Sequence, residues 1–330
     1  MNSRPAIIGA IAIAIAIAIP TSFTAYAAEN TPDFPSRALR LVVGFSPVGG
    51  ADVAARMLSV KLSEIVRQPV VVENRPGAGG AIGALYVANS VADGHTLLVV
   101  SSSYATIPIL YPQQAFEPAR DLTAIILIAE APMLLLVHPS LPARSVKELI
   151  ALAKAKPGLL NFSSGGEGTS SFLTGELFKS MAGVQIQHVP YKGAGPALID
   201  TIAGQVEMNF ASVFSALPHV KSGALRPLGV SSAKRSLVLP ELPTIAEGGL
   251  KGYNRTTWYG VLAPSRTPAA IISKLNADFE KTLQSTDVRQ RLLAEGSEAA
   301  GGPPKRFHDF LANEFEVTKT IIRRAGVSNK

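Results

Sequence analysis

One stretch, residues 41–52, constrains the fold more than any other part of the sequence. It overlaps an apolar, β-branched run at residues 40–45 that is typical of a buried strand. Residues 46–50 form a loop with two adjacent glycines, and from Ala51 onward apolar residues recur at helical spacing. A strand, a glycine loop and a helix in this order point free backbone N–H groups and the positive end of a helix dipole beyond the strand. We therefore expect an anion to bind there.

The alternation of strand and helix continues and predicts a parallel sheet. Residues 69–73 and 96–100 are predicted strands, and residues 81–90 between them are a predicted helix. Strands joined through helices pair in parallel by right-handed crossovers. Residues 101–104, Ser-Ser-Ser-Tyr, directly follow the third strand, and ligands of open parallel sheets gather at the carboxyl ends of the strands. These serines are either ligand contacts or an ordinary polar loop.

The same arrangement of strand, glycine loop and helix occurs again in the second half of the chain. Residues 160–163 are a predicted strand, residues 164–171 a glycine- and hydroxyl-rich loop, and residues 172–181 a helix. Beyond them, residues 190–196 are predicted as a loop and residues 197–203 as a helix. Because 330 residues are too many for one ordinary core, we expect two α/β lobes that grip a ligand from both sides.

Several element boundaries can be predicted from local signals. Residues 122–138 are one or two strands that lead out of the first lobe. Residues 145–148, Ser-Val-Lys-Glu, form a capping box at the start of a helix. Thr267 is a predicted N-cap followed by Pro268 at the first helical position. The helix over residues 304–324 carries one apolar stripe, which we assign to the core.

The first residues of the chain predict export. Arg4 supplies a short positive region, residues 6–19 are apolar, and residues 25–27, Ala-Tyr-Ala, fit a small-x-small cleavage site. The alternative is a membrane anchor, but an apolar run of this length is short for spanning a bilayer. We expect residues 1–27 to be a signal peptide and the mature protein to work in the periplasm. The absence of cysteine is compatible with an oxidising compartment.

Composition and motifs argue against nucleic-acid binding and most catalytic chemistry. The net charge of +7 comes from scattered Lys and Arg, with no basic stripe among aromatic residues. Such a charge favours anionic solutes in general. The sequence contains no Gly-x-Ser-x-Gly elbow, no Walker loop and no His-Glu-x-x-His. Its five histidines have no metal-ligand spacing. We expect a binding cleft without catalytic residues, metal or cofactor.

A series of short motifs runs in order along nearly all of the mature chain. The most specific are Asn-Arg-Pro-Gly-Ala-Gly-Gly at residues 74–80 and Val-Pro-Tyr-Lys-Gly at residues 189–193. The full series lies at residues 49–52, 69–80, 93–98, 137–142, 168–171, 188–193, 216–220, 242–247 and 258–260. In these motifs the chain resembles the tripartite tricarboxylate transporter solute receptors, the TctC or Bug family of periplasmic binding proteins.

The resemblance implies a type II periplasmic binding protein fold, with two α/β lobes joined by two crossing strands. We expect residues 29–129 and 253–330 in the first lobe and residues 130–252 in the second. The implied function is capture of a small organic carboxylate and its delivery to a tripartite tricarboxylate-type membrane transporter by a monomeric receptor. The alternatives are a ligand sensor that feeds a signalling partner and, more remotely, a hydrolase built in the cleft.

The resemblance also implies where the ligand binds. Members of this family grip the ligand carboxylate with the loop after the first strand, partly through ordered water, and with loops of the second lobe. Backbone N–H groups and hydroxyls can do this through charge-assisted hydrogen bonds. The binding residues implied on this chain are Phe45, Ser46, Val48, Gly49, Gly50, Asp52, Ser102, Ser164, Gly168, Thr169, Ser170, Tyr191 and Lys192.

Among these residues, Asp52 has a different expected role. A carboxylate beside a bound anion repels it, so we expect Asp52 to cap the helix start and to fix the glycine loop. The alternative is an ordinary first-turn Asp that interacts favourably with the helix dipole.

Two positions depart from the pattern of many relatives and bear on the ligand. Ala211 stands where many relatives have Asp, and Phe172 stands where many have His. Loss of an acidic group weakens recognition of an amine, and a Phe makes a pocket less polar. We therefore expect an aromatic or aliphatic mono- or dicarboxylate without a positive amine. The alternative for Phe172 is that it faces the core.

Overall fold

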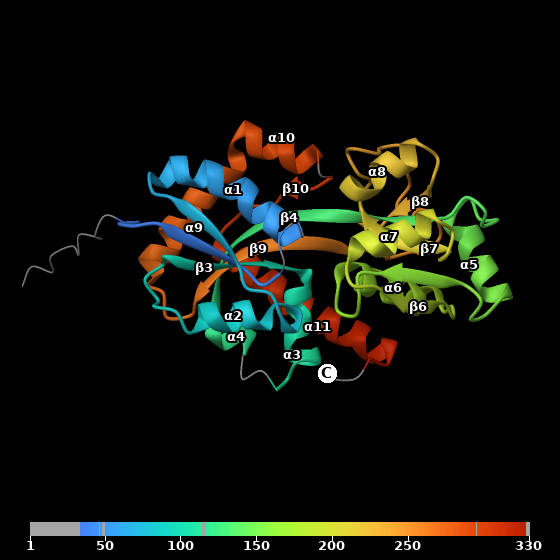
Figure 1. Ribbon diagram of the computed structural model, residues 1–330, viewed down its shortest axis with the longest axis horizontal. Coiled ribbons are helices and arrows are strands. Elements are labelled where there is room, and N and C mark those ends of the chain that lie inside the picture. The colour runs from blue at the N-terminus through green and yellow to red at the C-terminus, as the bar shows by residue number, and fades with distance from the viewer. Residues whose placement is uncertain (1–33, 46, 48–49, 114–116, 295, 328–330) are drawn as a thin grey trace, which may run out of the picture. The chain divides into compact units, whose positions relative to one another are not determined.

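The computed structural model describes residues 34–45, 47, 50–113, 117–294 and 296–327. The description below concerns the unit Asp33–Lys330. The predicted signal peptide, residues 1–27, lies outside the described residues. Within them, no helix is both long and apolar enough to cross a membrane. Figure 1 shows the elements of the chain in colour order.

The elements follow one another in the order that the sequence patterns predict, with short additions. The part of the chain up to the first long strand contains β1 (Leu39–Val43), α1 (Gly50–Val66), β2 (Val70–Asn74), η1 (Ala78–Gly80), α2 (Ala81–Ala88), β3 (Thr96–Ser101), η2 (Ser102–Thr106), α3 (Ile107–Leu110), α4 (Pro118–Asp121) and β4 (Leu122–Val137). The next part contains α5 (Val146–Ala155), β5 (Asn161–Ser164), α6 (Ser170–Ala182), β6 (Gln187–Pro190), α7 (Ala194–Ile202), β7 (Met208–Ser212), α8 (Val213–Lys221) and β8 (Arg226–Val230). The last part contains β9 (Thr256–Pro264), α9 (Ala269–Gln284), α10 (Thr286–Ala294), β10 (Glu298–Ala299) and α11 (Pro304–Ala325).

Two long strands, β4 and β9, connect two α/β lobes (Figure 1). In the first lobe, β1 pairs in parallel with β2 and β3, which confirms the predicted parallel sheet. In the second lobe, β5 pairs in parallel with β6 and β7. Strand β4 pairs with β9 from Leu122 to Pro132 and then with β7 and β8 from Met133 to Val137. The ladder therefore runs β2-β1-β3-β9-β4-β7-β5-β6 through both lobes.

The sheet of the first lobe is buried on both faces, as the continuous apolar run of β1 predicts. Successive side chains of a strand point to opposite faces. Leu41 and Val43 accordingly pack in one cluster with residues of α1, α9 and α10, whereas Val42 packs in another with residues of α2 and α11. In the second lobe, Leu135 and Leu134 of β4 divide in the same way between two clusters. Burial on both faces fixes the carboxyl ends of the strands, where the loops that are predicted to bind the ligand begin.

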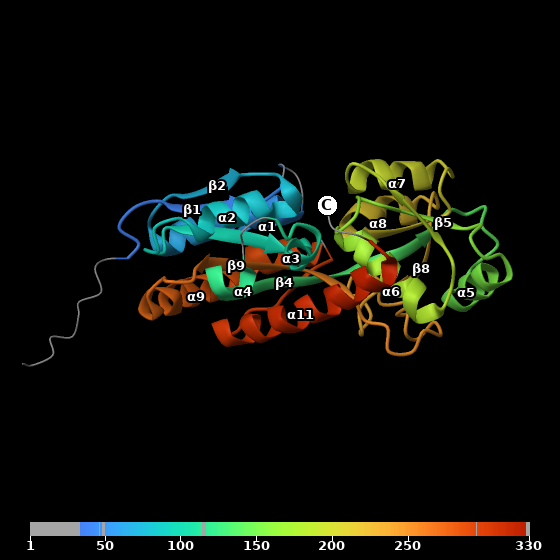
Figure 2. The same cartoon turned by 90° about the horizontal axis from the view of Figure 1, so that it is seen from below.

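Helix α11 packs against both lobes. Its residues Phe307 and Leu311 belong to a first-lobe cluster, and Ile321 and Ile322 belong to a second-lobe cluster. Figure 2 shows this helix passing below β4 from one lobe to the other. The apolar stripe predicted for this helix is therefore core, as expected, and it ties the two lobes together.

The predicted start of α7 was wrong. The helix begins at Ala194 rather than residue 197, with Gly193 as its N-cap at φ 121°. Gly195 and Pro196, which look like turn residues in sequence, form the first helical turn instead. A proline is tolerated there because the first-turn N–H groups have no intrahelical partner. The earlier start places the positive end of this helix in the region of the expected ligand.

Two predicted caps differ in detail from the structure. Ser145 Oγ accepts from the Glu148 amide at 3.2 Å as predicted, but the Glu148 carboxylate accepts from the amide of Arg144, one residue earlier than a capping box requires. The predicted N-cap Thr267 is wrong, because Pro268 occupies that position without a side-chain cap. The hydroxyl of Thr267 is buried instead.

A close contact between β9 and α11 gives a test of this packing. A Cβ added to Gly260 would overlap the ring of Phe307, which is itself fully buried. We expect Gly260→Ala to lower the free energy of unfolding by about 1–3 kcal/mol, the usual cost of overpacking. Chemical denaturation of the purified protein measures this change.

Gly195→Ala is the matched control, since nothing lies within 4 Å of an added Cβ there. Alanine in a helix is favoured over glycine by about 1 kcal/mol, so this variant should be as stable as the parent or more so. Equal destabilisation by the two substitutions would contradict the packing described.

Candidate functional site

A cavity of about 370 Å³ lies where the two lobes face each other. First-lobe residues that follow β1 and β3 form one side of it. Second-lobe residues at the starts of helices form the other, and β4 and β9 contribute Met133, Thr257 and Tyr259. The carboxyl ends of parallel strands from both lobes thus meet at one place, which is where ligands of such sheets bind.

Four helices present their N-terminal ends to this cavity: α1 from the first lobe and α6, α7 and α8 from the second. The first N–H groups of a helix have no intrahelical partner, and the end carries about half a positive charge. An anion near one such end typically gains about 0.3–1 kcal/mol. The lining residues at these four ends are Gly50, Ala51, Thr169, Ser170, Ser171, Gly193, Ala194, Gly195, Ser212 and Ser215.

The helix ends differ in how they are capped. Thr169 Oγ1 accepts from the amide of Phe172 at 3.4 Å, and Ser212 Oγ accepts from the amide of Ser215 at 3.3 Å. Helix α7 begins at Ala194, and its N-cap Gly193 provides no side-chain cap. Among the three second-lobe ends, the first-turn amides of α7 are therefore best placed to donate to a ligand rather than to a capping side chain.

Two loops of the second lobe, the one before α6 and the one before α7, are joined by backbone hydrogen bonds. The amide of Gly193 donates to the carbonyl of Gly165 at 3.2 Å, and the amide of Tyr191 donates to the carbonyl of Ser164 at 3.0 Å. A Cβ on Gly165 would lie 3.1 Å from the backbone nitrogen of Ala194. Glycine at position 165 thus allows the start of α7 to approach the loop before α6.

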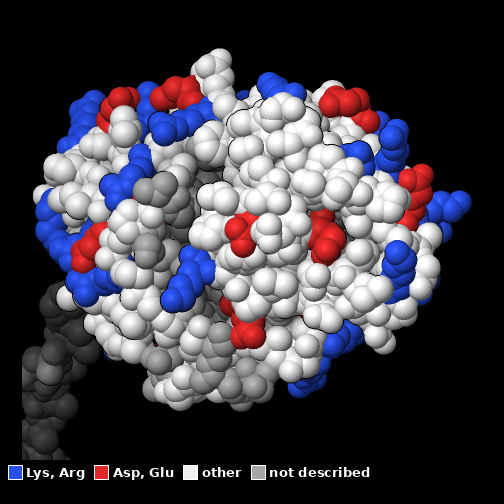
Figure 3. All heavy atoms as spheres, turned by 45° about the vertical axis from the view of Figure 1, so that its right-hand side comes forward, with Lys and Arg blue, Asp and Glu red and all other residues white. Residues whose placement is uncertain are grey.

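The described residues that line the cavity include no Asp, Glu, Lys, Arg or His. Its polar groups are the hydroxyls of serine, threonine and tyrosine residues and the amide of Asn209, besides the backbone. Apolar side chains complete the wall: Phe45, Met133, Leu198, Phe210 and Ala211. The face of the molecule shown in Figure 3 is different, because Lys and Arg side chains are spread over it among Asp and Glu. The cavity therefore offers dipoles, rather than ionised side chains, to a guest with an apolar body.

Asp52 supports the first-lobe loop. Its carboxylate is buried and accepts from Arg56 Nε at 2.9 Å and from Asn74 Nδ2 at 2.8 Å. The same Asn74 nitrogen donates to the carbonyl of Phe45 at 3.0 Å. Arg56 balances the charge of Asp52, and the carboxylate raises the pKa of this guanidinium. These contacts connect the helix start to Phe45, as the loop-fixing hypothesis requires.

The other predicted site residues lie at different distances from the cavity. Phe45, Gly50, Thr169 and Ser170 line it. Ser46, Val48 and Gly49 lie outside the described residues.

Ser102 and Ser164 are fully buried. Ser102 contacts Ser170 and Thr257, whereas Ser164 Oγ lies 2.6 Å from His188 Nε2.

The remaining three predicted residues belong to loops of the second lobe. A Cβ on Gly168 would lie 3.2 Å from Thr106 Oγ1 of the first lobe, so this glycine is at a contact between the lobes. The hydroxyl of Tyr191 donates to Asp200 at 2.7 Å, and Lys192 is exposed.

Phe172 and Ala211 differ in their relation to the cavity. Ala211 on β7 lines it. Phe172 is 1% exposed and packs in the second-lobe core, with its ring centroid 4.8 Å from that of His188. The suggestion that Phe172 makes the pocket less polar was therefore wrong, and the core-facing alternative is correct. The direction of a side chain in the first turn of a helix depends on packing that the local sequence does not specify.

Sequence reasoning missed the start of α7 and the start of α8. The signal for the first was present, since Gly193 and Pro196 bracket a first helical turn as an N-cap and an early proline often do. The start of α8 could also have been predicted, because a serine before a helical run, here Ser212, is a common N-cap. Asn209, Thr257 and Tyr259 carried no local signal, as they lie on strands and reach the cavity only through the sheet.

Two α/β lobes joined by crossing strands, with an anion-attracting cavity between them, define the class of two-lobed binding proteins. Comparison with known proteins identifies the family. Residues 54–327 match the tripartite tricarboxylate transporter family receptor, TctC, and the chain belongs to this family. This confirms the resemblance found in the sequence, and with it the periplasmic binding protein fold.

Relatives and solved structures support this assignment over almost the whole chain. The UPF0065 protein in the tcbD-tcbE intergenic region of Pseudomonas sp. strain P51 is 40% identical over 309 residues, which cover 93% of this chain and 91% of that protein. The structure of R. palustris Rpa4515 with adipate is 37% identical, with a TM-score of 0.81, and covers 90% of this chain and 100% of that one. MatC from Rhodopseudomonas palustris with bound malate is 31% identical, with a TM-score of 0.76, and covers 88% and 100%.

The contacts of Asp52 give one prediction. We expect Asp52→Ala to lower the free energy of unfolding by about 1–3 kcal/mol, because it leaves Arg56 Nε without its acceptor and removes one of the two acceptors of Asn74 Nδ2. Chemical denaturation measures the loss. Glu64→Ala on the same helix is the control, since it breaks only an exposed pair with Lys61 and should cost less than about 1 kcal/mol. If both variants are as stable as the parent, Asp52 is an ordinary first-turn residue.

His188 gives a second prediction, on pH dependence. Burial, which is the larger effect, and the positive charge of Lys179 lower the pKa of His188 from 6.5 to about 4. Between these two values the unfolded chain binds a proton that the folded chain does not, so stability falls as the pH drops through this range. We expect a smaller fall from pH 7 to pH 4.5 in His188→Gln, measured by urea denaturation. NMR titration of the His188 ring should show it neutral above about pH 5, and a midpoint near 6.5 would refute the assignment.

Proposed function

We propose that this protein is a solute receptor that captures a small organic carboxylate in the cavity between its lobes. The observation that carries the proposal is the meeting of four helix N-termini in a cavity whose described lining holds no ionised side chain. Free amides and hydroxyls form charge-assisted hydrogen bonds to a carboxylate. The bound adipate and malate in two related structures are carboxylates as well.

The lining favours a ligand with an apolar body and without an amine. Phe45, Met133 and Phe210 face the cavity and can pack against hydrocarbon. Ala211 presents no carboxylate where an ammonium would need one. An aliphatic or aromatic mono- or dicarboxylate meets both conditions, whereas aspartate or glutamate would leave a buried positive charge unpaired, at considerable cost.

In this proposal the predicted site residues take different roles. Phe45, Gly50, Thr169 and Ser170 contact the ligand, with Ser170 doing so through its backbone amide, together with the start of α7. Asp52 fixes the first-lobe loop, and Ser164 belongs to the support of the second-lobe loop. Roles in ligand binding for Ser46, Val48, Gly49, Gly168, Tyr191 and Lys192 stay predictions from the family resemblance.

The place of action and the partner are also part of the proposal. Removal of residues 1–27 would release the receptor into the periplasm. The ligand stabilises the closed arrangement of the lobes, and the closed receptor delivers it to a membrane transporter of the tripartite tricarboxylate type. The proposed lobes are residues 29–129 with 253–330, and residues 130–252. Ligand capture, rather than catalysis, is the activity that a cavity of dipoles supports.

Calorimetric titration tests the ligand class. We expect adipate, malate or a similar carboxylate to bind, and aspartate and inorganic phosphate to bind much more weakly. A ligand at 100 times its dissociation constant should stabilise the protein by about 2.7 kcal/mol, which a thermal shift detects. Tight binding of aspartate with no binding of simple carboxylates would overturn the proposal.

A pair of variants at Ala211 tests the charge argument. Ala211→Asp should weaken carboxylate binding at least about tenfold, which corresponds to 1.4 kcal/mol of repulsion. Ala211→Asn has nearly the same shape without the charge, and we expect it to lose much less affinity. Equal losses in the two variants would show that size, rather than charge, decides at this position.

A further inference from the structure

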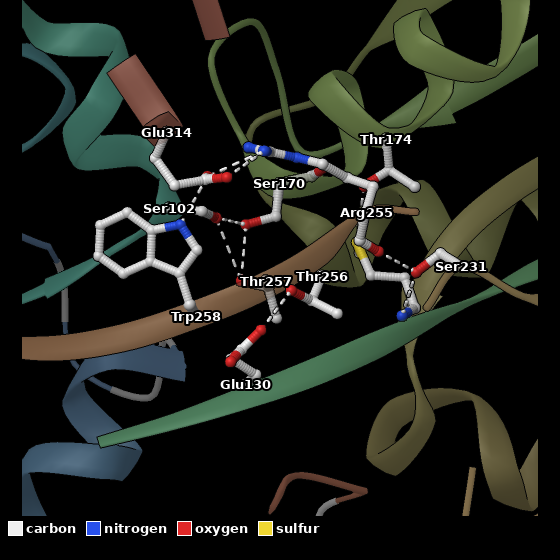
Figure 4. Close-up of polar contacts among 11 residues, drawn as sticks. Ser102, Glu130, Ser170, Thr174, Ser231, Arg255, Thr256, Thr257, Trp258 and Glu314 are labelled. Atoms are coloured by element: carbon white, nitrogen blue, oxygen red, sulfur yellow. Dashed lines mark hydrogen bonds and ion pairs between the residues drawn. The ribbon is translucent and has the colours of Figure 1, made fainter. Parts of the chain in front are cut away.

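We propose that Ser102, Ser170 and Thr257 form a latch that holds the two lobes closed, and that Ser102 acts on the lobes rather than on the ligand. This inference rests on the proposed function as a receptor that closes around its ligand. Figure 4 shows the three side chains pointing toward one another. We call them the hydroxyl triangle.

The hydroxyl triangle joins three parts of the fold that are distant in sequence. Ser102 lies in η2 after β3 of the first lobe, Ser170 is the first residue of α6 in the second lobe, and Thr257 is on the crossing strand β9. The oxygen of Ser102 is 2.6 Å from that of Ser170 and 3.2 Å from that of Thr257. Ser170 and Thr257 are 3.0 Å apart. The contact of Ser102 with Ser170 therefore connects the two lobes directly.

Two observations indicate that Ser102 does not contact the ligand: its side chain is buried, and its hydroxyl proton is used within the triangle. Ser170 and Thr257 line the cavity, whereas Ser102 is fully buried. A hydroxyl donates one hydrogen bond and can accept more. Three hydroxyls in a cycle, each donating to the next, use all three protons within the triangle. The triangle is thus complete without a ligand and depends only on the lobes being together.

Hydrogen bonds of two residues close to it in the chain, Arg255 and Trp258, fix the position of Thr257. Arg255 Nη1 donates to both carboxylate oxygens of Glu314, at 3.0 and 2.8 Å, and Trp258 Nε1 donates to the same carboxylate at 2.7 Å. Glu314 lies in the middle of α11, which packs against both lobes. With Thr257 fixed between Arg255 and Trp258, separation of the lobes breaks the triangle by moving Ser102 and Ser170 apart.

A second contact beside the triangle belongs to the same interface. The loop before α6 rests on the first lobe at Gly168, where a Cβ would lie 2.9 Å from Leu110 Cδ1 and 3.2 Å from Thr106 Oγ1. Gly168 has φ +80°, in the region that favours glycine. The hydroxyl triangle is therefore part of a packed surface between the lobes, and we expect it to break when the lobes separate.

A latch and a ligand contact have different thermodynamic consequences. A contact made only in the closed state shifts the closing equilibrium by the same factor whatever ligand is bound. A direct ligand contact changes affinity by an amount that depends on the ligand. A net hydrogen-bond contribution of typical size corresponds to a change of about 2- to 10-fold.

The first experiment compares dissociation constants of Ser102→Ala and the parent for adipate and for malate. We expect Ser102→Ala to weaken both by the same factor, about 2- to 10-fold, through faster dissociation. Ser103→Ala, at the neighbouring residue that lines the cavity, should instead change the two constants by different factors. Unequal factors for Ser102→Ala, or no change for either ligand, would overturn the latch.

The second experiment needs no ligand, so it separates failure of the latch from failure of the proposed function. The chain has no cysteine, and Val60 on the first lobe and Leu159 on the second are 67% and 66% exposed. Dyes on cysteines placed there report the distance between the lobes by single-molecule energy transfer. We expect Ser102→Ala to reduce the closed fraction of the unliganded protein.

Thr257→Val keeps the shape of the side chain and removes the hydroxyl. It should also reduce the closed fraction of the unliganded protein, and it replaces Ser102→Ala in this test if that variant does not fold. An unchanged distribution in both variants overturns the latch even if carboxylates bind. Absence of carboxylate binding to the parent, with the expected shift present, refutes the proposed function and leaves the latch standing.

Discussion

The structure depends on one buried ion pair, between Arg255, directly before β9, and Glu314 in the middle of α11. The two side chains are 4% and 7% exposed as residues, and Trp258 donates to the same carboxylate. Removing one partner of such a pair typically costs about 3–5 kcal/mol, because it leaves the other charge buried and unpaired. The pair is therefore a positional constraint: it holds the crossing strand against α11, whose apolar stripe enters the cores of both lobes.

This constraint sets the position of the cavity, and the helix N-termini around it make it attractive to anions. Once β4 and β9 are fixed, the carboxyl ends of the strands in each lobe face one another, and the helices that follow begin at the cavity. Backbone amides placed in this way need no long side chain to be ordered, so an anion bound to them does not cost the rotamer entropy of a lysine or an arginine. The negative charge of Asp52 near this place is tolerated because Arg56 balances it.

The sequence allowed much of this to be predicted, and the exceptions have physical causes. The strand and helix periods of β1, α1 and α11 are properties of consecutive residues, and they were read correctly. The start of α7 was not, because Gly193, Gly195 and Pro196 favour a turn as strongly as a first helical turn. Phe172 could not be placed, since its direction follows from the packing of α6 on His188. The contact of Ser102 with Ser170 joins residues of two lobes, and no local pattern specifies it.

The lining also favours a carboxylate over phosphate as the proposed ligand, a choice that residues 41–52 alone left open. Phosphate carries more charge at neutral pH and is hydrated on every side, so an apolar wall would desolvate it without compensation. A carboxylate concentrates its charge at one end. That end can meet the starts of α6, α7 and α8, while the rest of the molecule lies against Phe45, Met133 and Phe210. The asymmetry of the cavity, with dipoles clustered on the second lobe and apolar groups around them, matches the asymmetry of an organic acid.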